Sequence, residues 1–152
     1  MDKQARIIVV DDDEDVVKSL KTILESEGYL VDYAVTGKEA IRKTQKTTYN
    51  IALIDIKLPD MPGIDLLSLI RDDVPRTRKV IITGYPNLQN AILAINKHAD
   101  GFLLKPIDIK KLLEIVEEQL EFQRDEDEYS EKKIAEFLRS KLKELKDDSE
   151  QP

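Results

Sequence analysis

Short, uniformly apolar runs alternate along the chain with longer segments that have apolar residues at helical spacing. The clearest runs are Ile7–Val10, Ile51–Ile54 and Val80–Ile82. A run that is apolar at every position predicts a strand buried on both faces, as in a parallel sheet covered by helices. Two weaker runs, 29–35 and 101–105, bring the predicted strands to five, and we expect 29–35 at an edge of the sheet.

Between these runs, apolar residues recur every three or four positions, which predicts amphipathic helices. The residues on the predicted inner faces are Val16, Val17, Leu20, Ile23 and Leu24; Ala40, Ile41 and Thr44; Ile64, Leu66, Leu67, Leu69 and Ile70; and Ala91, Ile92, Ala94 and Ile95. The stretches Asp13–Asp15 and Thr36–Glu39 are typical of helix N-termini, and Asp108 is a good N-cap for a fifth helix. Gly28 is typical of the position that follows a helix.

Strands that alternate with amphipathic helices predict an α/β fold with helices on both faces of a parallel sheet. Right-handed crossover connections leave few arrangements of such units. We therefore expect a flavodoxin-like, doubly wound, five-stranded parallel sheet with the strand order 2-1-3-4-5. A length of 152 residues is enough for one such domain and short for two.

The C-terminal part of the chain has no Gly and no Pro between Pro106 and Pro152, and it is rich in Glu, Lys and Leu. This composition predicts helix well beyond the sheet. We interpret it as a fifth helix that ends near Phe122, a charged stretch over 123–132 and a second amphipathic helix with an apolar stripe over 134–145. One uninterrupted helix is the alternative.

Polar side chains stand where four of the five predicted strands end: Asp11 and Asp12, Asp55, Thr83 and Lys105. The carboxyl ends of parallel strands share one edge of the sheet, where open α/β sheets bind ligands. A single Asp after a strand is more often a loop residue. Because these groups follow neighbouring strands in the expected order, we expect them to converge into a functional site.

The expected cluster has the chemistry of a phosphoryl-binding site. Two carboxylates a few Å apart repel each other by roughly 4 kcal/mol near a protein surface, so three need a cation or raised pKa values. Oxygen ligands without Cys favour Mg²⁺ over zinc. Lys105 and Thr83 add a positive charge and a hydroxyl, and Asp55 has the chemistry of a nucleophile in phosphoryl transfer.

Four stretches of the chain together resemble the receiver domain of two-component response regulators: Val9–Asp15 (VVDDDED), Ala52–Leu67 (ALIDIKLPDMPGIDLL), Val80–Gly84 (VIITG) and Phe102–Pro106 (FLLKP). The resemblance covers about residues 5–122. It leaves 123–152 as a charged, helical C-terminal extension or linker.

The resemblance implies that Asp55 accepts a phosphoryl group from the phosphohistidine of a sensor histidine kinase or a phosphotransfer protein. It implies that Asp12 and Asp55 ligate Mg²⁺ directly, that the backbone carbonyl of Lys57 is a third ligand, and that Asp11 contributes through water. The chain would then be a signalling switch that assists its own phosphorylation and dephosphorylation and turns over no external substrate.

The same resemblance implies that Lys105 pairs with the phosphate and that its bond to Pro106 is cis. Thr83 would move toward the phosphate and Phe102 would turn inward behind it. These movements would switch the face formed by the fourth helix, the fifth strand and the fifth helix for a downstream protein target. One departure from the family is Pro62, which stands where an acid often precedes the turn glycine.

Composition excludes several other classes. The net charge of −7 disfavours direct nucleic acid binding. The chain has no Cys, which fits a reducing cytoplasm, and no apolar run approaches the roughly 20 residues that span a membrane. The alternatives are a constitutive interaction module with the extension as its binding element, the N-terminal fragment of a longer transcriptional response regulator, and a metal-dependent hydrolase. A homodimer is compatible with each.

Overall fold

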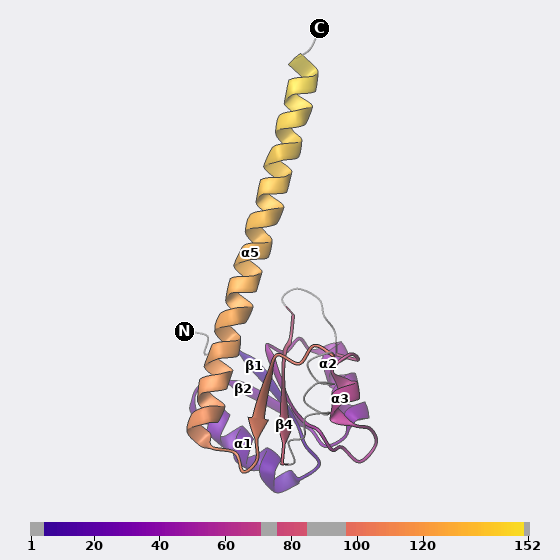
Figure 1. Cartoon of the computed structure of the whole chain (residues 1–152), viewed down its shortest axis with the longest axis vertical. Coiled ribbons are helices and arrows are strands. Elements are labelled where there is room, and N and C mark those ends of the chain that lie inside the picture. The colour runs from indigo at the N-terminus through magenta and orange to yellow at the C-terminus, as the bar shows by residue number, and fades with distance from the viewer. Residues whose placement is uncertain (1–4, 71–75, 85–96, 151–152) are drawn as a thin grey trace.

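The structure is a computed structural model that describes residues 5–70, 76–84 and 97–150. Five parallel strands form one sheet in the order β2-β1-β3-β4-β5. The sheet lies among the shorter helices, at one end of the long C-terminal helix (Figure 1). The strands are β1 (Arg6–Val10), β2 (Leu30–Ala34), β3 (Ile51–Asp55), β4 (Arg78–Thr83) and β5 (Gly101–Leu104). The predicted fold class and strand order are confirmed, and β2 lies at the expected edge.

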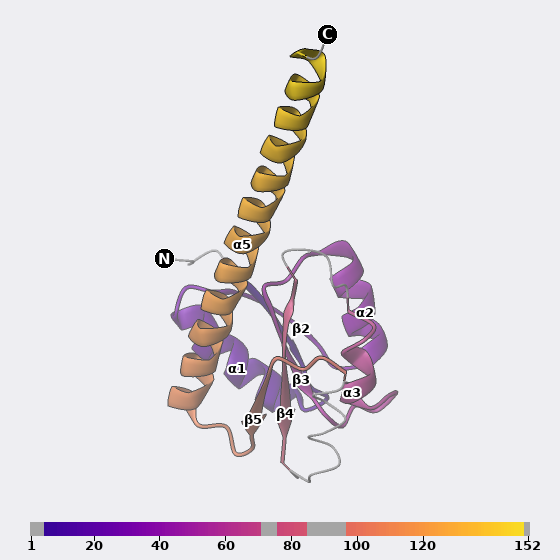
Figure 2. The same cartoon turned by 45° about the horizontal axis from the view of Figure 1, so that its top comes forward.

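Helices cover both faces of this sheet. On one face lie α1 (Glu14–Ser26) and the first part of α5 (Ile109–Glu150), and on the other lie α2 (Gly37–Lys46) and α3 (Gly63–Leu66) (Figure 2). Successive residues of a strand point to opposite faces, so Ile7 belongs to the first core and Ile8 to the second. Two buried faces explain why the central strands are apolar at every position.

The predicted helix ends are confirmed where the structure describes them. The Asp13 carboxylate accepts hydrogen bonds from the first turn of α1, and the Thr36 hydroxyl accepts one from the first turn of α2. Asp108 does the same for the backbone amides that begin α5. Gly28, after α1, has a φ of 96°, a conformation that L side chains rarely adopt.

The third helix is shorter than the apolar spacing predicts. After α3 the chain turns through bonds of the i to i+3 type, such as the one from Leu69 N to Leu66 O. The ammonium of Lys79, a fully buried residue, donates to the Leu67 carbonyl at 2.7 Å. Leu69 is exposed, so its predicted place on the inner face is wrong. The predicted fourth helix, 91–95, lies outside the described residues.

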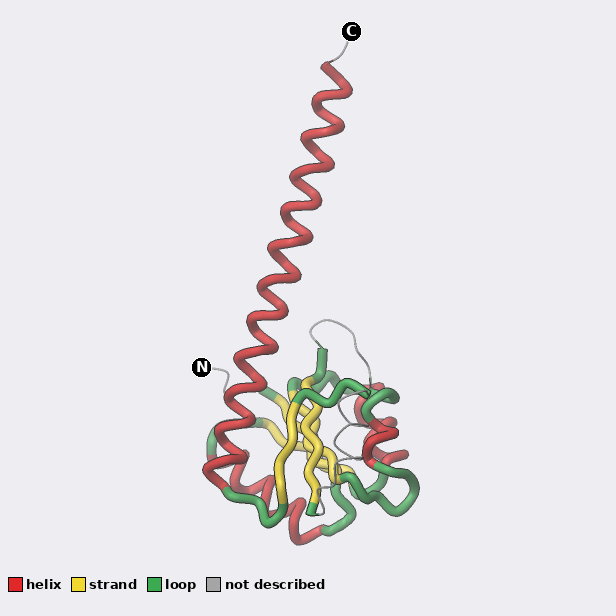
Figure 3. Tube along the Cα trace, viewed as in Figure 1, coloured by secondary structure: helices red, strands yellow, loops and turns green. Residues whose placement is uncertain are grey.

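The predicted break after Phe122 is wrong: α5 is a single helix of 42 residues that continues far beyond the sheet (Figure 3). The polar stretch in the middle of α5 begins with a residue that contacts the rest of the domain. Gln123 is buried, and its side-chain amide donates to Asn50 O at 3.1 Å and to Arg76 O at 2.8 Å. Within the described residues, no helix combines the length and the apolar composition that a membrane crossing requires.

Candidate functional site

Parallel pairing brings the carboxyl ends of the strands to one edge of the sheet. Asp55 lies opposite Ile82 in the β3–β4 pair, and Thr83 lies opposite Leu104 in the β4–β5 pair. Lys105 follows β5 directly, and its backbone N–H donates to Thr83 O at 2.9 Å. The register therefore places the last residues of these strands, with their polar side chains, side by side.

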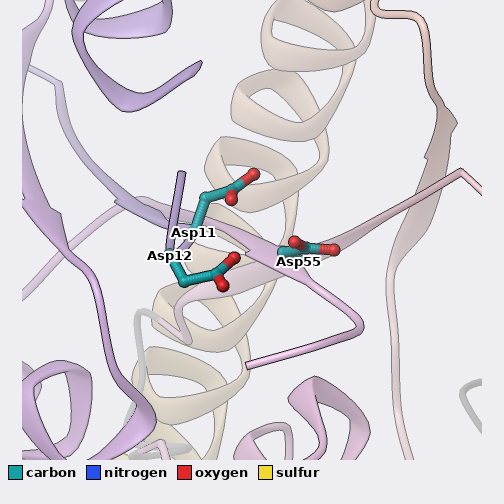
Figure 4. Close-up of side chains that lie close together, drawn as sticks. All are labelled: Asp11, Asp12 and Asp55. Carbon is teal, nitrogen blue, oxygen red and sulfur yellow. The ribbon is translucent and has the colours of Figure 1, made fainter. Parts of the chain in front are cut away.

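Three carboxylates converge at this edge, as predicted. Asp11 and Asp12 follow β1, Asp55 ends β3, and one carboxylate oxygen from each lies within 4.8 Å of the others (Figure 4). Asp11 is only 1% exposed and Asp55 only 6%, whereas Asp12 is exposed. The backbone N–H of Asp13 donates to Asp11 Oδ1 at 2.9 Å, which holds that carboxylate in place.

Lys105 supplies the positive charge that faces these acids. Its Nζ lies 3.2 Å from Asp11 Oδ2 and 3.3 Å from Asp55 Oδ2. The side chain is 30% exposed, so the ammonium is held by two buried carboxylates while solvent still reaches it. The Lys105–Pro106 peptide bond is cis, as the resemblance implies.

The electrostatics of the cluster are visible in the pKa values of Asp11 and Lys105. Burial raises the pKa of Asp11 above its ordinary value, and the nearby Asp55 charge adds to this, although the Asp13 N–H and Lys105 oppose it. Burial alone would lower the pKa of Lys105, but Asp11 and Asp55 together raise it above its ordinary value. Lys105 is therefore a permanent cation beside an excess of negative charge.

The other predicted site residues surround this cluster. Thr83 is buried at the end of β4, and the backbone N–H of Lys57 lies 3.4 Å from Asp55 Oδ1. Phe102, on β5, is half-buried and packs against the core beneath α2 and α3. These positions are compatible with the roles expected for Lys57, Thr83 and Phe102, which stay predictions.

The structure shows a contact of Asp60 that the sequence does not predict. The Asp60 carboxylate accepts the backbone N–H of Gly37 at 2.8 Å and that of Lys38 at 2.9 Å, both at the start of α2. These hydrogen bonds lower the pKa of Asp60 below its ordinary value. No local sequence signal marks this pair, because 23 positions separate Asp60 from Gly37.

The donor set of the acidic cluster suggests a site for a divalent metal ion. It offers carboxylate oxygens from Asp11, Asp12 and Asp55, and no nitrogen or sulfur ligand belongs to the group. Hard cations such as Mg²⁺ and Ca²⁺ prefer oxygen ligands. The residues present therefore fit such an ion.

The chain is similar to proteins of one family. The family model described as the response regulator receiver domain matches residues 7–117. A CheY-like receiver domain protein from Methanospirillum hungatei JF-1 is 41% identical, with a TM-score of 0.77, and the match covers 81% of this chain and 98% of that one. A response regulator from Burkholderia pseudomallei, solved with a phosphorylated aspartic acid, a calcium ion and citrate, is 28% identical, with a TM-score of 0.68 and coverages of 72% and 65%.

A curated relative is much longer than this chain. The alginate biosynthesis transcriptional regulatory protein AlgB of Pseudomonas putida is 32% identical over 120 residues. The match covers 79% of this chain but only 27% of AlgB. Most of the length of that regulator therefore has no counterpart in the matched residues.

Proposed function

Because the chain belongs to the response regulator receiver family, we propose that it is the phosphoacceptor of a two-component phosphorelay. A receiver domain is a signalling module and not an enzyme that turns over an external substrate. Its family implies a histidine kinase partner in general. The specific proposal is that Asp55 receives a phosphoryl group from a kinase or phosphotransfer-protein phosphohistidine in a Mg²⁺-dependent reaction.

The observation that carries this proposal is the position of Lys105 between Asp11 and Asp55, beside a cluster that fits a divalent ion. In the proposed step, an Asp55 carboxylate oxygen forms a bond to phosphorus while the bond from phosphorus to the histidine nitrogen breaks. The imidazole keeps that electron pair and takes up a proton. The Lys105 ammonium is placed to neutralise charge on the transferred oxygens.

Asp11, Asp12 and Asp55, together with the Lys57 carbonyl, are the residues that would hold Mg²⁺. The ion would supply charge neutralisation for the phosphoryl oxygens. Asp11 keeps the acceptor in place indirectly, because it shares Lys105 with Asp55. The calcium ion and phosphorylated aspartic acid of the Burkholderia pseudomallei relative support this assignment by analogy.

The proposed output is a shift between two conformations. Thr83 ends β4 next to β5, the strand that carries Phe102, so a phosphoryl group bound near Thr83 has a short route to that strand. A modification that binds one conformation better than the other shifts their populations. We place the resulting change at β5 and the adjoining part of α5, in a protein that we expect in the cytoplasm.

The test is the intact mass of the whole chain after incubation with acetyl phosphate, with and without Mg²⁺. Wild type is expected to gain one phosphoryl group only with Mg²⁺, and Asp55→Asn is expected to gain none. Asp125→Asn, at an exposed position of α5, is the matched control and is expected to react like wild type. A gain that persists in Asp55→Asn would overturn the proposal.

A second candidate function comes from the exposed stripe of α5, which we define as Ile134, Leu138, Leu142 and Leu145. Their exposed fractions run from 54% to 67%. Monomeric proteins rarely leave a continuous apolar face uncovered. We propose that this stripe binds an apolar groove of a partner protein, which is the interaction-module alternative expected from the sequence.

The charged residues beside the exposed stripe indicate which kind of groove would bind it. At 100° per residue, one edge of the stripe is lined by basic residues: Lys132, Arg139, Lys143 and Lys146. A second copy fits poorly, because pairing along the stripe would set Lys141 against Lys146 in a parallel pair and the basic edge against itself in an antiparallel one. A groove rimmed by carboxylates complements this edge.

The N-terminal-fragment alternative has its support in the greater length of AlgB.

A further inference from the structure

We propose that Asp60 is a positioning residue for the metal site: it ties the loop between β3 and α3 to the start of α2 and so keeps the Lys57 carbonyl in place for Mg²⁺. The inference rests on the proposed function, because it assigns a role toward the same ion. Asp60 itself is exposed and belongs to no group of potential metal ligands found among the described residues.

The contact is specific in its geometry. Asp60 Oδ1 accepts from Gly37 N and Oδ2 from Lys38 N, so each carboxylate oxygen binds one amide. The first amides of a helix have no carbonyl partner inside it and lie at its positive end. Thr36 serves the same helix end separately, through a 3.1 Å bond to its hydroxyl from Glu39 N. The start of α2 is thus held both locally and from the distant loop.

A second contact closes the loop onto α2. A Cβ added to Gly37 would lie 2.6 Å from Met61 Cγ, which is closer than real Cβ contacts. Only the absence of a side chain at Gly37 lets the Met61 side chain lie this close to the helix. Asp60 and its neighbour Met61 therefore both attach the tip of the loop to the same residue of α2.

The base of the loop is attached to the acceptor strand. Gly63 N donates to Ile56 O at 2.8 Å, and Lys57 and Pro62 form a bridge across the base. A Cβ on Gly63 would lie 1.9 Å from the Asp55 carbonyl oxygen, so the returning chain runs directly against the acceptor residue. Lys57, whose carbonyl is the expected third ligand, lies between the held base and the held tip, so release of the tip would leave this segment anchored at the base alone.

The departure from the family pattern at Pro62 makes Asp60 the sole acid of this loop. Pro62 is the N-cap residue of α3 and forms no side-chain cap hydrogen bond. The Asp60 carboxylate therefore accepts hydrogen bonds from the start of α2 and not from the start of α3. Groups that hydrogen-bond directly to a metal ligand are typically worth roughly 10–100-fold in metal affinity. Asp60 acts one step further out, through the loop that carries Lys57, so we expect an effect at the lower end of this range.

The experiment measures Mg²⁺ affinity by calorimetric titration of the full chain in four forms: wild type, Asp60→Ala, Asp60→Asn and Thr36→Ala. Asp60→Ala is expected to weaken Mg²⁺ binding roughly tenfold. Asp60→Asn keeps one acceptor oxygen and is expected to restore part of the affinity. Thr36→Ala removes a cap bond from the same end of α2 without touching the loop, so it should lower the melting temperature and leave Mg²⁺ affinity unchanged.

Equal affinity in wild type and Asp60→Ala would overturn the inference. So would an equal loss in Thr36→Ala, because the effect would then belong to the stability of α2. If Asp60→Ala does not fold, the comparison of Asp60→Asn with Thr36→Ala decides in the same way. Absence of Mg²⁺ binding by wild type would instead contradict the proposed function, which keeps the two failures distinguishable.

Discussion

Lys105 Nζ lies 3.3 Å from Asp55 Oδ2, although 50 positions separate the two residues and β4 lies between their strands. The lysine side chain spans the end of β4 and also reaches Asp11 on the far side of β3. One ammonium therefore connects the ends of three strands. The negative charges of Asp11 and Asp55 are therefore both balanced by the ammonium of Lys105.

Replacement of Lys105 by methionine should slow phosphorylation of Asp55 without preventing the protein from folding. The apolar stem keeps its packing, but the positive charge that would stabilise the transferred oxygens is lost. Removal of one such group typically costs roughly 10²-fold in rate. The initial rate of mass gain with acetyl phosphate measures the effect, and Lys110→Met, at an exposed position of α5, is the control. Equal rates in both variants would contradict this role.

Stability should depend on pH through Asp11. Its pKa is raised above the ordinary 3.8 by burial and by Asp55, so the folded state binds this proton more tightly than the unfolded state. The ionised form therefore destabilises the fold above the raised pKa, and this cost disappears as the pH falls below 3.8. Asp11→Asn should gain stability relative to wild type as the pH rises.

Urea unfolding of wild type and Asp11→Asn at about pH 4 and pH 7 with a chelator present tests this sign. Other carboxylates titrate in both proteins, so only the difference between the two midpoints is informative. A difference that stays constant, or one that favours wild type more strongly at neutral pH, would show that burial of Asp11 is compensated in some other way.

Added Mg²⁺ should raise the melting temperature because it binds the folded chain and relieves repulsion within the acidic cluster. At a free concentration ten times the dissociation constant, the expected stabilisation is about 1.4 kcal/mol. Asp12→Asn, which removes one exposed carboxylate of the cluster, should reduce the shift. Sodium chloride at matched ionic strength is the control, and an equal shift with that salt would indicate screening instead of binding.

The contact between Gln123 and the domain should stabilise the fold. Gln123→Ala leaves the side chain and carbonyl of Asn50 and the carbonyl of Arg76 without the amide that now binds them, which should cost about 1–3 kcal/mol. Leu138→Ala, on the exposed stripe, should change stability by less than about 0.5 kcal/mol. Chemical unfolding of both variants compares them directly, and a small effect at Gln123 would place the end of the stable domain before this residue.

The exposed stripe should not drive self-association, because its basic edge meets like charge in a second copy. Sedimentation at increasing protein concentration is expected to show a monomer at low and at high salt. A dimer that dissociates in Leu138→Glu, but not in the control Glu128→Gln, would identify a homodimer formed through α5. That outcome would replace the proposed acidic groove.

Much of the fold follows from the pattern of apolar residues alone. Runs such as Ile51–Ile54 are apolar on both faces because helices cover both sides of the sheet, and this is readable without coordinates. Strand order and the shared carboxyl edge follow from the alternation of strands and helices. For that reason the cluster of Asp11, Asp12 and Asp55 with Lys105 was predictable.

Other features depend on contacts between residues far apart in the sequence. The apolar spacing after Gly63 suggests a longer helix, but α3 is short and the buried Lys79 binds the carbonyl of Leu67 just beyond it. The charged stretch after Phe122 suggests a break in the helix. Instead, Gln123 and Glu126 bind polar groups at the amino end of β4, and α5 continues through the charged stretch.

By itself, the sequence determined the α/β class, the strand order and the identity of the acidic cluster, because local periodicity and strand ends encode them. Only the tertiary structure decided where Asp60 binds, how long α5 is and which side of it stays exposed. The physical reason is that a hydrogen bond between distant residues leaves no periodic trace in the sequence. The hydrogen bonds from Gly37 and Lys38 to Asp60 exist only once the loop after β3 has folded against α2.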